Sequence, residues 1–144
     1  MNLDEASLAA CLAVPRWVRA VLDGQPYDSP EALFAVASRT AATLTADEVA
    51  LALADHPRIG DKSGSATSRA EQSGVDNVDE FVAANREYEQ RFGRIYLVCA
   101  AGRGGSALLA DLRERLGNSA SEELAVTVRE LGKIALLRLA KVVQ

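Results

Sequence analysis

The sequence is poor in the residues that most often build metal sites, disulfide frameworks and base-stacking surfaces. Its 144 residues contain one histidine, two cysteines and only 5% aromatic residues. One histidine and two separated cysteines in apolar surroundings do not make a zinc site. The cysteines are instead typical of buried free thiols in a reducing compartment. Scarce aromatic residues argue against a stacking surface for single-stranded nucleic acid. We therefore expect no metal ligands.

An excess of positive charge and a long apolar run are missing as well. The net charge is −4, whereas general nucleic-acid binders depend on attraction to phosphate. No apolar run reaches the roughly 18 residues of a membrane span, and the first five residues are acidic where a secretory signal is basic. These absences predict a cytoplasmic protein that binds neither nucleic acid nor membrane. One local arginine can still bind a small anion.

What remains is the composition of an ordinary globular domain. Hydrophobic residues make up 49% of the chain and charged residues 25%, which are usual fractions. A chain of this length can bury a core without disulfides. No internal repeat, low-complexity tract or linker is present. We therefore predict a single domain over residues 1–144.

Capping residues and apolar spacing predict helices along most of the chain. Asn2, Asn77 and Ser106 are expected N-caps, and Thr45 with Glu48 fits a capping box. The apolar run at 95–100 has no partner strand, so we interpret it as a buried, partly helical segment. The predicted helices cover about residues 3–14, 15–22, 30–44, 46 to at most 55, 67–72, 78–92, 107–116 and 121–143.

The predicted fold is an all-α, single-domain multi-helix bundle with a long C-terminal helix and two glycine-bearing active-site loops. One loop follows His56 and the other precedes Ser106. Gly132 lies within the long helix, where glycine costs roughly 1 kcal/mol against alanine, so we expect it to permit a close helix crossing. Apolar residues recur along one face of this helix, namely Leu124, Val128, Leu131, Ala135, Leu139 and Val142.

His56 is the first candidate for acid/base chemistry, because histidine is the usual proton donor and acceptor near neutral pH. A lone histidine is more often a helix-terminal or satisfied core residue, so its neighbours decide. Pro57 fixes the backbone beside it. Ser68, Glu71 and Gln72 share a helix face at spacings of three and four, and Glu71 would orient His56. A solvated surface helix is the alternative interpretation of that face.

Arg103 stands in the glycine-rich segment 101–105. Glycines let the backbone approach a ligand closely, and the guanidinium fork fits a carboxylate. A surface turn is an equally good interpretation. The segment has neither a dinucleotide fingerprint nor a phosphate-loop lysine, and the chain contains no G-x-S-x-G nucleophile motif. Any chemistry is therefore expected to be acid/base work without a cofactor.

These residues are parts of a longer pattern. It comprises H-P-R-I-G-D-K at 56–62, S-R-A-E-Q-S-G-V at 68–75, Y-E-Q-R-F-G at 88–93, A-A-G-R at 100–103 and L-L-R-L-A-K at 136–141. P-R-W-V at 15–18 and Y-D-S-P-E-A-L at 27–33 extend it over nearly the whole chain. Together the motifs resemble the 2-oxo-4-hydroxy-4-carboxy-5-ureidoimidazoline (OHCU) decarboxylase family. The histidine motif followed by S-x-x-E-Q is the specific part.

The resemblance implies an all-α homodimer that needs no cofactor and decarboxylates OHCU to (S)-allantoin in uric acid degradation. Residues 94–96 depart from the aromatic-proline-aromatic run that is frequent in the family, which affects the packing beside the pocket and not the acid/base set. The implied site residues are His56 and Glu71 for catalysis, and Pro57, Ser68, Gln72 and Arg103 for substrate binding.

Two other functions remain open. A helical interaction module would expose an apolar stripe on the C-terminal helix, at Leu124, Val128 and Leu131. The decarboxylase instead requires His56, Glu71 and Arg103 to converge on one pocket. A family member that acts on a related ureido or imidazoline acid would use the same groups, so the sequence does not separate it from an OHCU decarboxylase.

Overall fold

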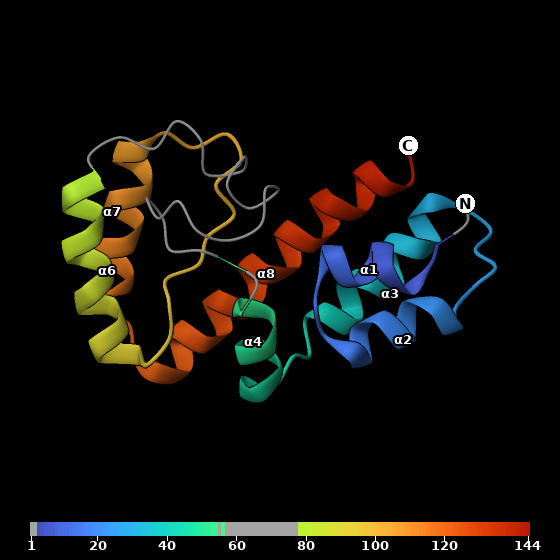
Figure 1. The fold of residues 1–144 in the computed structure, drawn as a ribbon, viewed down its shortest axis with the longest axis horizontal. Helices are drawn as coiled ribbons and strands as arrows, with labels where there is room; N and C mark the ends of the chain where they lie inside the picture. Colours follow the sequence, from blue (N-terminus) through green and yellow to red (C-terminus); the bar gives the residue numbers. More distant parts are fainter. Residues whose placement is uncertain (1–2, 55, 57–77) are drawn as a thin grey trace. The chain divides into compact units, whose positions relative to one another are not determined.

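The computed structural model describes residues 3–54, 56 and 78–144 (Figure 1). Within these ranges every element of regular secondary structure is a helix, which confirms the all-α prediction for this part of the chain. The residues form two compact units, the first made of Met1–Ala52 with Val128–Gln144 and the second of Leu53–Thr127. No described helix is both long and apolar enough to cross a membrane.

The first unit is held together by helices that pack around buried aromatic and aliphatic side chains. α2 packs against both α1 and α3. Trp17 on α2 is fully buried and donates its Nε1–H to the carbonyl oxygen of Ala37 on α3, at 2.9 Å. Complete burial of such large apolar side chains contributes about 1.5–3 kcal/mol each. The helices of this unit are α1 (Glu5–Cys11), α2 (Pro15–Asp23), α3 (Pro30–Ala41), nearly all of α4 (Ala46–Leu53) and the C-terminal half of α8 (Ala120–Val142).

The helix starts in this unit follow the sequence signals, with one correction. Thr45 and Glu48 form the predicted capping box, in which each side chain accepts a backbone N–H of the other residue, at 3.2 and 3.0 Å. The first helix is shorter than predicted, because its N-cap is Asp4, which accepts the Ser7 N–H at 2.7 Å. It ends at Cys11, and the residues before Pro15 are extended, as the residue preceding a proline prefers to be.

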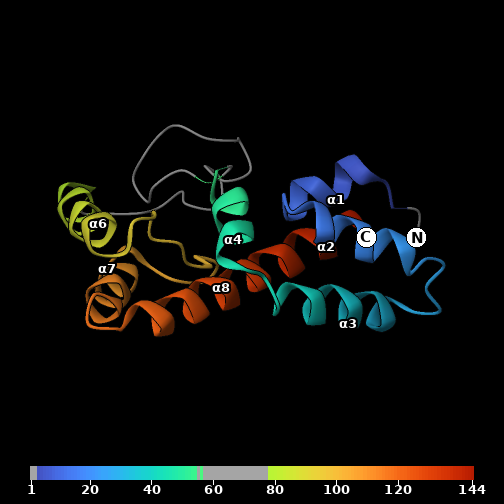
Figure 2. The same ribbon diagram turned by 90° about the horizontal axis from the view of Figure 1, so that it is seen from below.

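The second unit contains a helical hairpin and the segment that joins its two helices. α6 (Val78–Phe92) and α7 (Gly105–Arg115) lie side by side in both ribbon views (Figures 1 and 2). Gly93 ends α6 as predicted, with a φ of 73° that favours glycine. The shared core of the hairpin and the segment includes Phe81, Ala84, Tyr88, Tyr96, Val98, Leu108, Leu109 and Leu112.

Two predictions for the joining segment are wrong. Residues 95–100 are buried in their middle, at Tyr96–Val98, but form neither helix nor strand. Within the buried part, the carbonyl oxygen of Leu97 accepts the Nη1–H of Arg115 at 2.7 Å, so this backbone group is paired without a strand partner. Ser106 does not cap α7, which begins two residues earlier than predicted, at Gly105, with Gly104 as N-cap. The carbonyl oxygen of Gly104 closes the first turn by accepting the Leu108 N–H at 3.1 Å.

The long C-terminal helix is confirmed within one residue at each end, but its buried face differs from the predicted one. Leu131, Ala135 and Leu139 are buried, whereas Val142 is exposed. Polar residues also occupy the buried side of α8, namely Glu123, Thr127, Glu130 and Arg138. Gly132 lies close to α3, but a Cβ added to it would lie 3.7 Å from the Ala41 Cβ, an ordinary contact, so glycine is not required for this approach.

Candidate active site

Of the two predicted catalytic residues, His56 and Glu71, the structure describes only His56. It follows α4 in a half-buried position, and its backbone N–H donates to the carbonyl oxygen of Leu53 at 3.0 Å. This bond closes one further turn after the helix, so the backbone at the histidine is fixed from its N-terminal side. Pro57, Ser68, Glu71 and Gln72 lie outside the described residues, and the convergence of these side chains with His56 stays a prediction.

Arg103 lies in a tight turn at the end of the joining segment. Its backbone N–H donates to the carbonyl oxygen of Ala100 at 3.0 Å. Gly102, with a φ of +76°, supplies the left-handed conformation that this turn requires. The Arg103 side chain is about one third exposed (34%), and its Nη1 lies 3.9 Å from Oδ1 of Asp111 on α7. A guanidinium at this level of exposure can both reach a dissolved anion and be oriented by the protein.

Asp111 connects Arg103 to the interior of the second unit. Its other oxygen, Oδ2, accepts the hydroxyl proton of Tyr96 at 2.5 Å and lies 3.6 Å from Nη1 of Arg115. Tyr96 is almost fully buried, and its ring faces the Arg115 guanidinium at 4.6 Å, a favourable cation–π distance. The carboxylate of Asp111 therefore lies between a buried cation and a half-exposed one.

The buried cation is itself neutralised by a carboxylate on α8. Arg115 donates Nε to both oxygens of Glu123, at 3.0 and 2.9 Å, and Nη2 to Oε2 at 2.7 Å. Glu123 is completely buried and also accepts the hydroxyl proton of Tyr88, at 2.5 Å, and an Nδ2–H of Asn118, at 3.2 Å. Buried charges are tolerated when they are paired and hydrogen-bonded in this way.

The protonation states of this cluster follow from burial and pairing. Burial, together with the hydrogen bond to Glu123, raises the pKa of Tyr88 to about 12. Burial and the Asp111 carboxylate likewise hold the pKa of Tyr96 well above its ordinary value. Burial opposes the charge of Arg115, but the hydrogen bonds and charge of Glu123 outweigh it and raise the pKa of the guanidinium. Both phenols are therefore proton donors to carboxylates at neutral pH.

Sequence patterns alone did not identify this cluster as part of the site. The only local signal is the spacing of Asp111 and Arg115, which places both on one face of α7. Glu123 and Tyr88 come from other helices and are brought to Arg115 by the tertiary fold. Among the described residues, no three His, Cys, Asp or Glu side chains are grouped so as to hold a metal ion.

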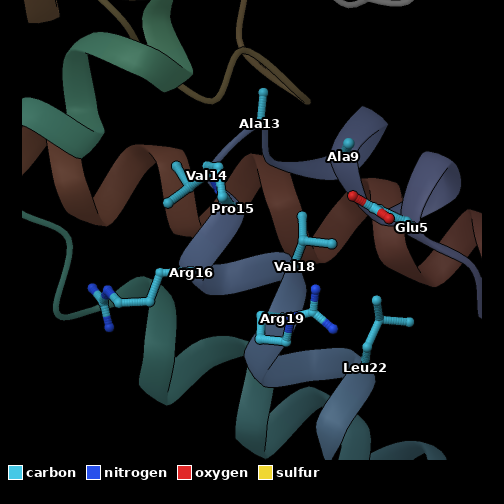
Figure 3. Close-up of a pocket in the computed structure, with 9 residues that line it drawn as sticks. All are labelled: Glu5, Ala9, Ala13, Val14, Pro15, Arg16, Val18, Arg19 and Leu22. Carbon is cyan, nitrogen blue, oxygen red and sulfur yellow. The ribbon is translucent and has the colours of Figure 1, made fainter.

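A separate hollow lies in the first unit, between α1 and α2. Its volume is about 490 Å³, and Figure 3 shows Glu5 on α1 and Arg16 and Arg19 on α2 around apolar side chains. Arg16 is already paired with Glu48, from Nε and Nη2 at 2.8 Å each. His56 and Arg103, the two predicted site residues that the structure describes, do not line this hollow, so it is not treated as the candidate active site.

The chain has curated relatives along its whole length. The uric acid degradation bifunctional protein TTL of Arabidopsis thaliana is 26% identical over 98% of this chain and 48% of its own length. A 2-oxo-4-hydroxy-4-carboxy-5-ureidoimidazoline decarboxylase of Amia calva is 36% identical over 55% of this chain and 49% of its own length. The chain therefore spans about half the length of these relatives.

Solved structures share the fold. A crystal structure of OHCU decarboxylase in the presence of (S)-allantoin matches with a TM-score of 0.82 at 25% identity, covering 97% of this chain and 98% of its own. A crystal structure of (S)-allantoin synthase shares the fold with a TM-score of 0.71 at 18% identity, over 95% of this chain and 48% of its own. The sequence model of the OHCU decarboxylase family matches residues 4–140, and the chain belongs to that family.

Proposed function

We propose that this protein is a cofactor-independent carboxy-lyase that converts OHCU to (S)-allantoin in uric acid degradation. The observation that carries the proposal is the likeness over nearly the full length. The family match covers residues 4–140, and the fold agrees with that of an OHCU decarboxylase solved with (S)-allantoin. A half-buried histidine after α4 and a half-exposed arginine before α7 supply the two kinds of group that the reaction needs.

The substrate can undergo this reaction without an external electron sink. In OHCU the carbon that bears the carboxylate and a hydroxyl is bonded to the carbon of a ring C=N bond. When the bond to the carboxylate breaks, CO2 leaves and the electron pair is delocalised towards that nitrogen. The ring nitrogen takes up a proton. The enol hydroxyl then loses a proton to become a carbonyl group while the neighbouring carbon gains one, so the net change is loss of CO2 and gain of one proton. The protonated face fixes the (S) configuration.

Each proposed site residue has a role in that sequence. His56 moves the proton of the substrate hydroxyl and takes part in protonation, because an imidazole exchanges protons readily near neutral pH. Glu71 orients His56, and Pro57 fixes the backbone beside it. Arg103 holds the substrate carboxylate through its planar fork. Ser68 and Gln72 complete the substrate contacts.

The cellular setting is part of the proposal. Neither Cys11 nor Cys99 forms a disulfide, which supports a reducing, cytoplasmic location. We further propose that residues 1–144 act as one OHCU decarboxylase domain, for which the continuous family match is the support. The protein is proposed to work as a homodimer, with OHCU as its partner molecule and no nucleic acid or membrane surface.

A role as a helical interaction module is not favoured. That function requires an exposed apolar stripe at Leu124, Val128 and Leu131 on α8. Leu131 is buried, and Leu124 and Val128 are half-buried. No continuous apolar patch is therefore available at these three positions for a partner.

The proposed function is tested by the optical activity of the product. OHCU is generated enzymatically just before use, and allantoin formation is followed by circular dichroism with and without the protein. Spontaneous decay gives racemic allantoin, so the proposal expects a large excess of the (S) enantiomer only when the protein is present. A racemic product formed at the spontaneous rate would refute it.

A further inference from the structure

The side chains around Asp111 form a continuous series of polar contacts. The series runs from the core of the second unit to the surface turn that contains Arg103. Glu123 and Thr127 on α8 hold the Arg115 guanidinium, with Thr127 Oγ1 accepting from Nη2 at 3.3 Å. Arg115 and the Tyr96 hydroxyl then face one oxygen of Asp111, at 3.6 and 2.5 Å. The other oxygen of Asp111 faces Arg103 at 3.9 Å.

The geometry of the carboxylate is fixed from its buried side. Tyr96 is 1% exposed and belongs to the apolar core, so its hydroxyl cannot follow a moving partner. The Asp111 side chain is 29% exposed and lies on the second half of α7, one turn before Arg115. Since Oδ2 is bound by a rigid donor, Oδ1 is presented to the Arg103 guanidinium in one orientation.

We propose that Asp111, held by Tyr96 and Arg115, is a positioning residue that orients the Arg103 guanidinium for the carboxylate of the substrate. An arginine side chain loses much rotamer freedom when it is held in one place. An arginine that is oriented before the substrate arrives loses less freedom on binding, and the substrate binds more tightly. This inference rests on the proposed function, because it assigns Arg103 to substrate binding.

The Asp111 carboxylate could affect substrate binding in two opposite ways, and this makes the inference testable. Asp111 is an anion near the cation that would bind an anionic substrate, so electrostatic competition alone would weaken binding. If competition dominated, removing the charge of Asp111 would lower the KM. If positioning dominates, removing it raises the KM. The sign of the change therefore separates the two effects.

The experiment measures KM and kcat for stereospecific allantoin formation in four variants and in a matched control. Asp111→Asn keeps an oxygen for the Tyr96 hydroxyl but removes the charge that faces Arg103. Tyr96→Phe keeps the buried ring and removes the hydroxyl that holds Asp111. Arg103→Ala and the double variant Arg103→Ala/Asp111→Asn complete a double-mutant cycle. Glu114→Gln removes one negative charge from an exposed position of the same helix.

The inference expects Asp111→Asn to raise the KM about three- to tenfold while kcat changes by less than about twofold. Tyr96→Phe raises the KM in the same direction, and it decides the matter if Asp111→Asn does not fold. In the Arg103→Ala background Asp111→Asn has no further effect, because a positioning residue acts only through the residue it positions. Glu114→Gln behaves like the wild type.

The inference is overturned if the KM of Asp111→Asn is unchanged or lower, or if its effect persists in the Arg103→Ala background. A purely structural role of Asp111 would leave the KM unchanged, since loss of folded protein lowers only the apparent kcat. Failure of the proposed function can be told apart from failure of this inference, because the wild type itself would then give no excess of (S)-allantoin.

Discussion

Arg115 on α7 and Glu123 on α8 form a buried ion pair with three hydrogen bonds of 2.7–3.0 Å. The side chains are 5% and 0% exposed. The pair joins the start of α8 to the helical hairpin, and through the Leu97 carbonyl it also fixes the segment before Arg103. One arginine thus serves both the stability of the second unit and the shape of the candidate site.

Replacing Arg115 with methionine is expected to destabilise the protein by about 3–5 kcal/mol, because it leaves the Glu123 carboxylate buried without its partner. The matched control is Arg113→Met on the same helix, where the pair with Glu80 is long and exposed, with Nη2 and Oε2 at 3.5 Å. An exposed pair of this kind contributes roughly 0–1 kcal/mol. Urea unfolding followed by circular dichroism measures both. Equal losses in the two variants would contradict the prediction.

His56→Ala is expected to lower the rate of (S)-allantoin formation by about 100- to 10,000-fold, which is the usual contribution of a positioned acid or base. The melting temperature should change little, because the residue is half-buried and alanine keeps the backbone hydrogen bond to Leu53. Product chirality and thermal melts check the two parts. Near wild-type formation of (S)-allantoin would remove His56 from the mechanism.

Arg103→Lys is expected to raise the KM roughly tenfold although the charge is kept, because lysine lacks the planar fork that binds both oxygens of a carboxylate. The comparison is Arg103→Ala, whose KM should rise further, by about 10- to 100-fold. Steady-state kinetics on freshly made OHCU gives both values. If lysine supports wild-type kinetics, Arg103 acts only as a point charge.

Acid should weaken the pair between Arg16 and Glu48. Hydrogen bonds from Arg16 and from the Thr45 backbone lower the pKa of Glu48 from 4.5 to about 2. A carboxyl whose pKa is lower in the folded protein contributes stability above its ordinary pKa and loses it as the pH falls towards the folded value. The stability difference between the wild type and Glu48→Gln should therefore be constant above about pH 5 and shrink between pH 4.5 and 2. Urea unfolding across this range tests it, and a constant difference would contradict it.

Gly132→Ala should stabilise the protein by about 0.5–1 kcal/mol. The new methyl group meets the Ala41 Cβ at an ordinary 3.7 Å, and alanine is the better helix former. Thermal and urea unfolding provide the measurement. A loss of stability would mean that the contact with α3 is tighter than this distance indicates.

Sequence patterns of a few neighbouring residues correctly predicted those helix ends that the same few residues determine. The capping box of Thr45 and Glu48 and the left-handed glycine after α6 are each specified by a few neighbouring residues. The Ser106 cap failed because the helix begins two residues earlier, where Gly104, another residue accepted at N-caps, takes that position. The prediction for the apolar run at 95–100 failed for another reason, since a side chain from a later helix, Arg115, pairs with the Leu97 carbonyl in its buried middle.

The sequence predicted those candidate site residues whose chemical role can be inferred from the residue type and its immediate neighbours. A lone histidine before a proline and an arginine among glycines are visible in the sequence, and the motifs of the family joined them to Ser68, Glu71 and Gln72. Asp111 was not predicted, because its partners Tyr96 and Arg103 lie 15 and 8 residues away in irregular structure. Its role depends on a tertiary arrangement that no local pattern encodes.

The segment between Gly93 and Gly104 keeps its path through a few side-chain contacts, without a continuous backbone ladder. Tyr96–Val98 point into the core, whereas Arg94, Ile95 and Cys99 are only half-buried. Substitutions at the half-buried positions can therefore change the chemical character of this strip while its course is preserved. The segment leads along the chain to Arg103, so such substitutions would change the chain that precedes the proposed substrate-binding arginine at little cost in stability.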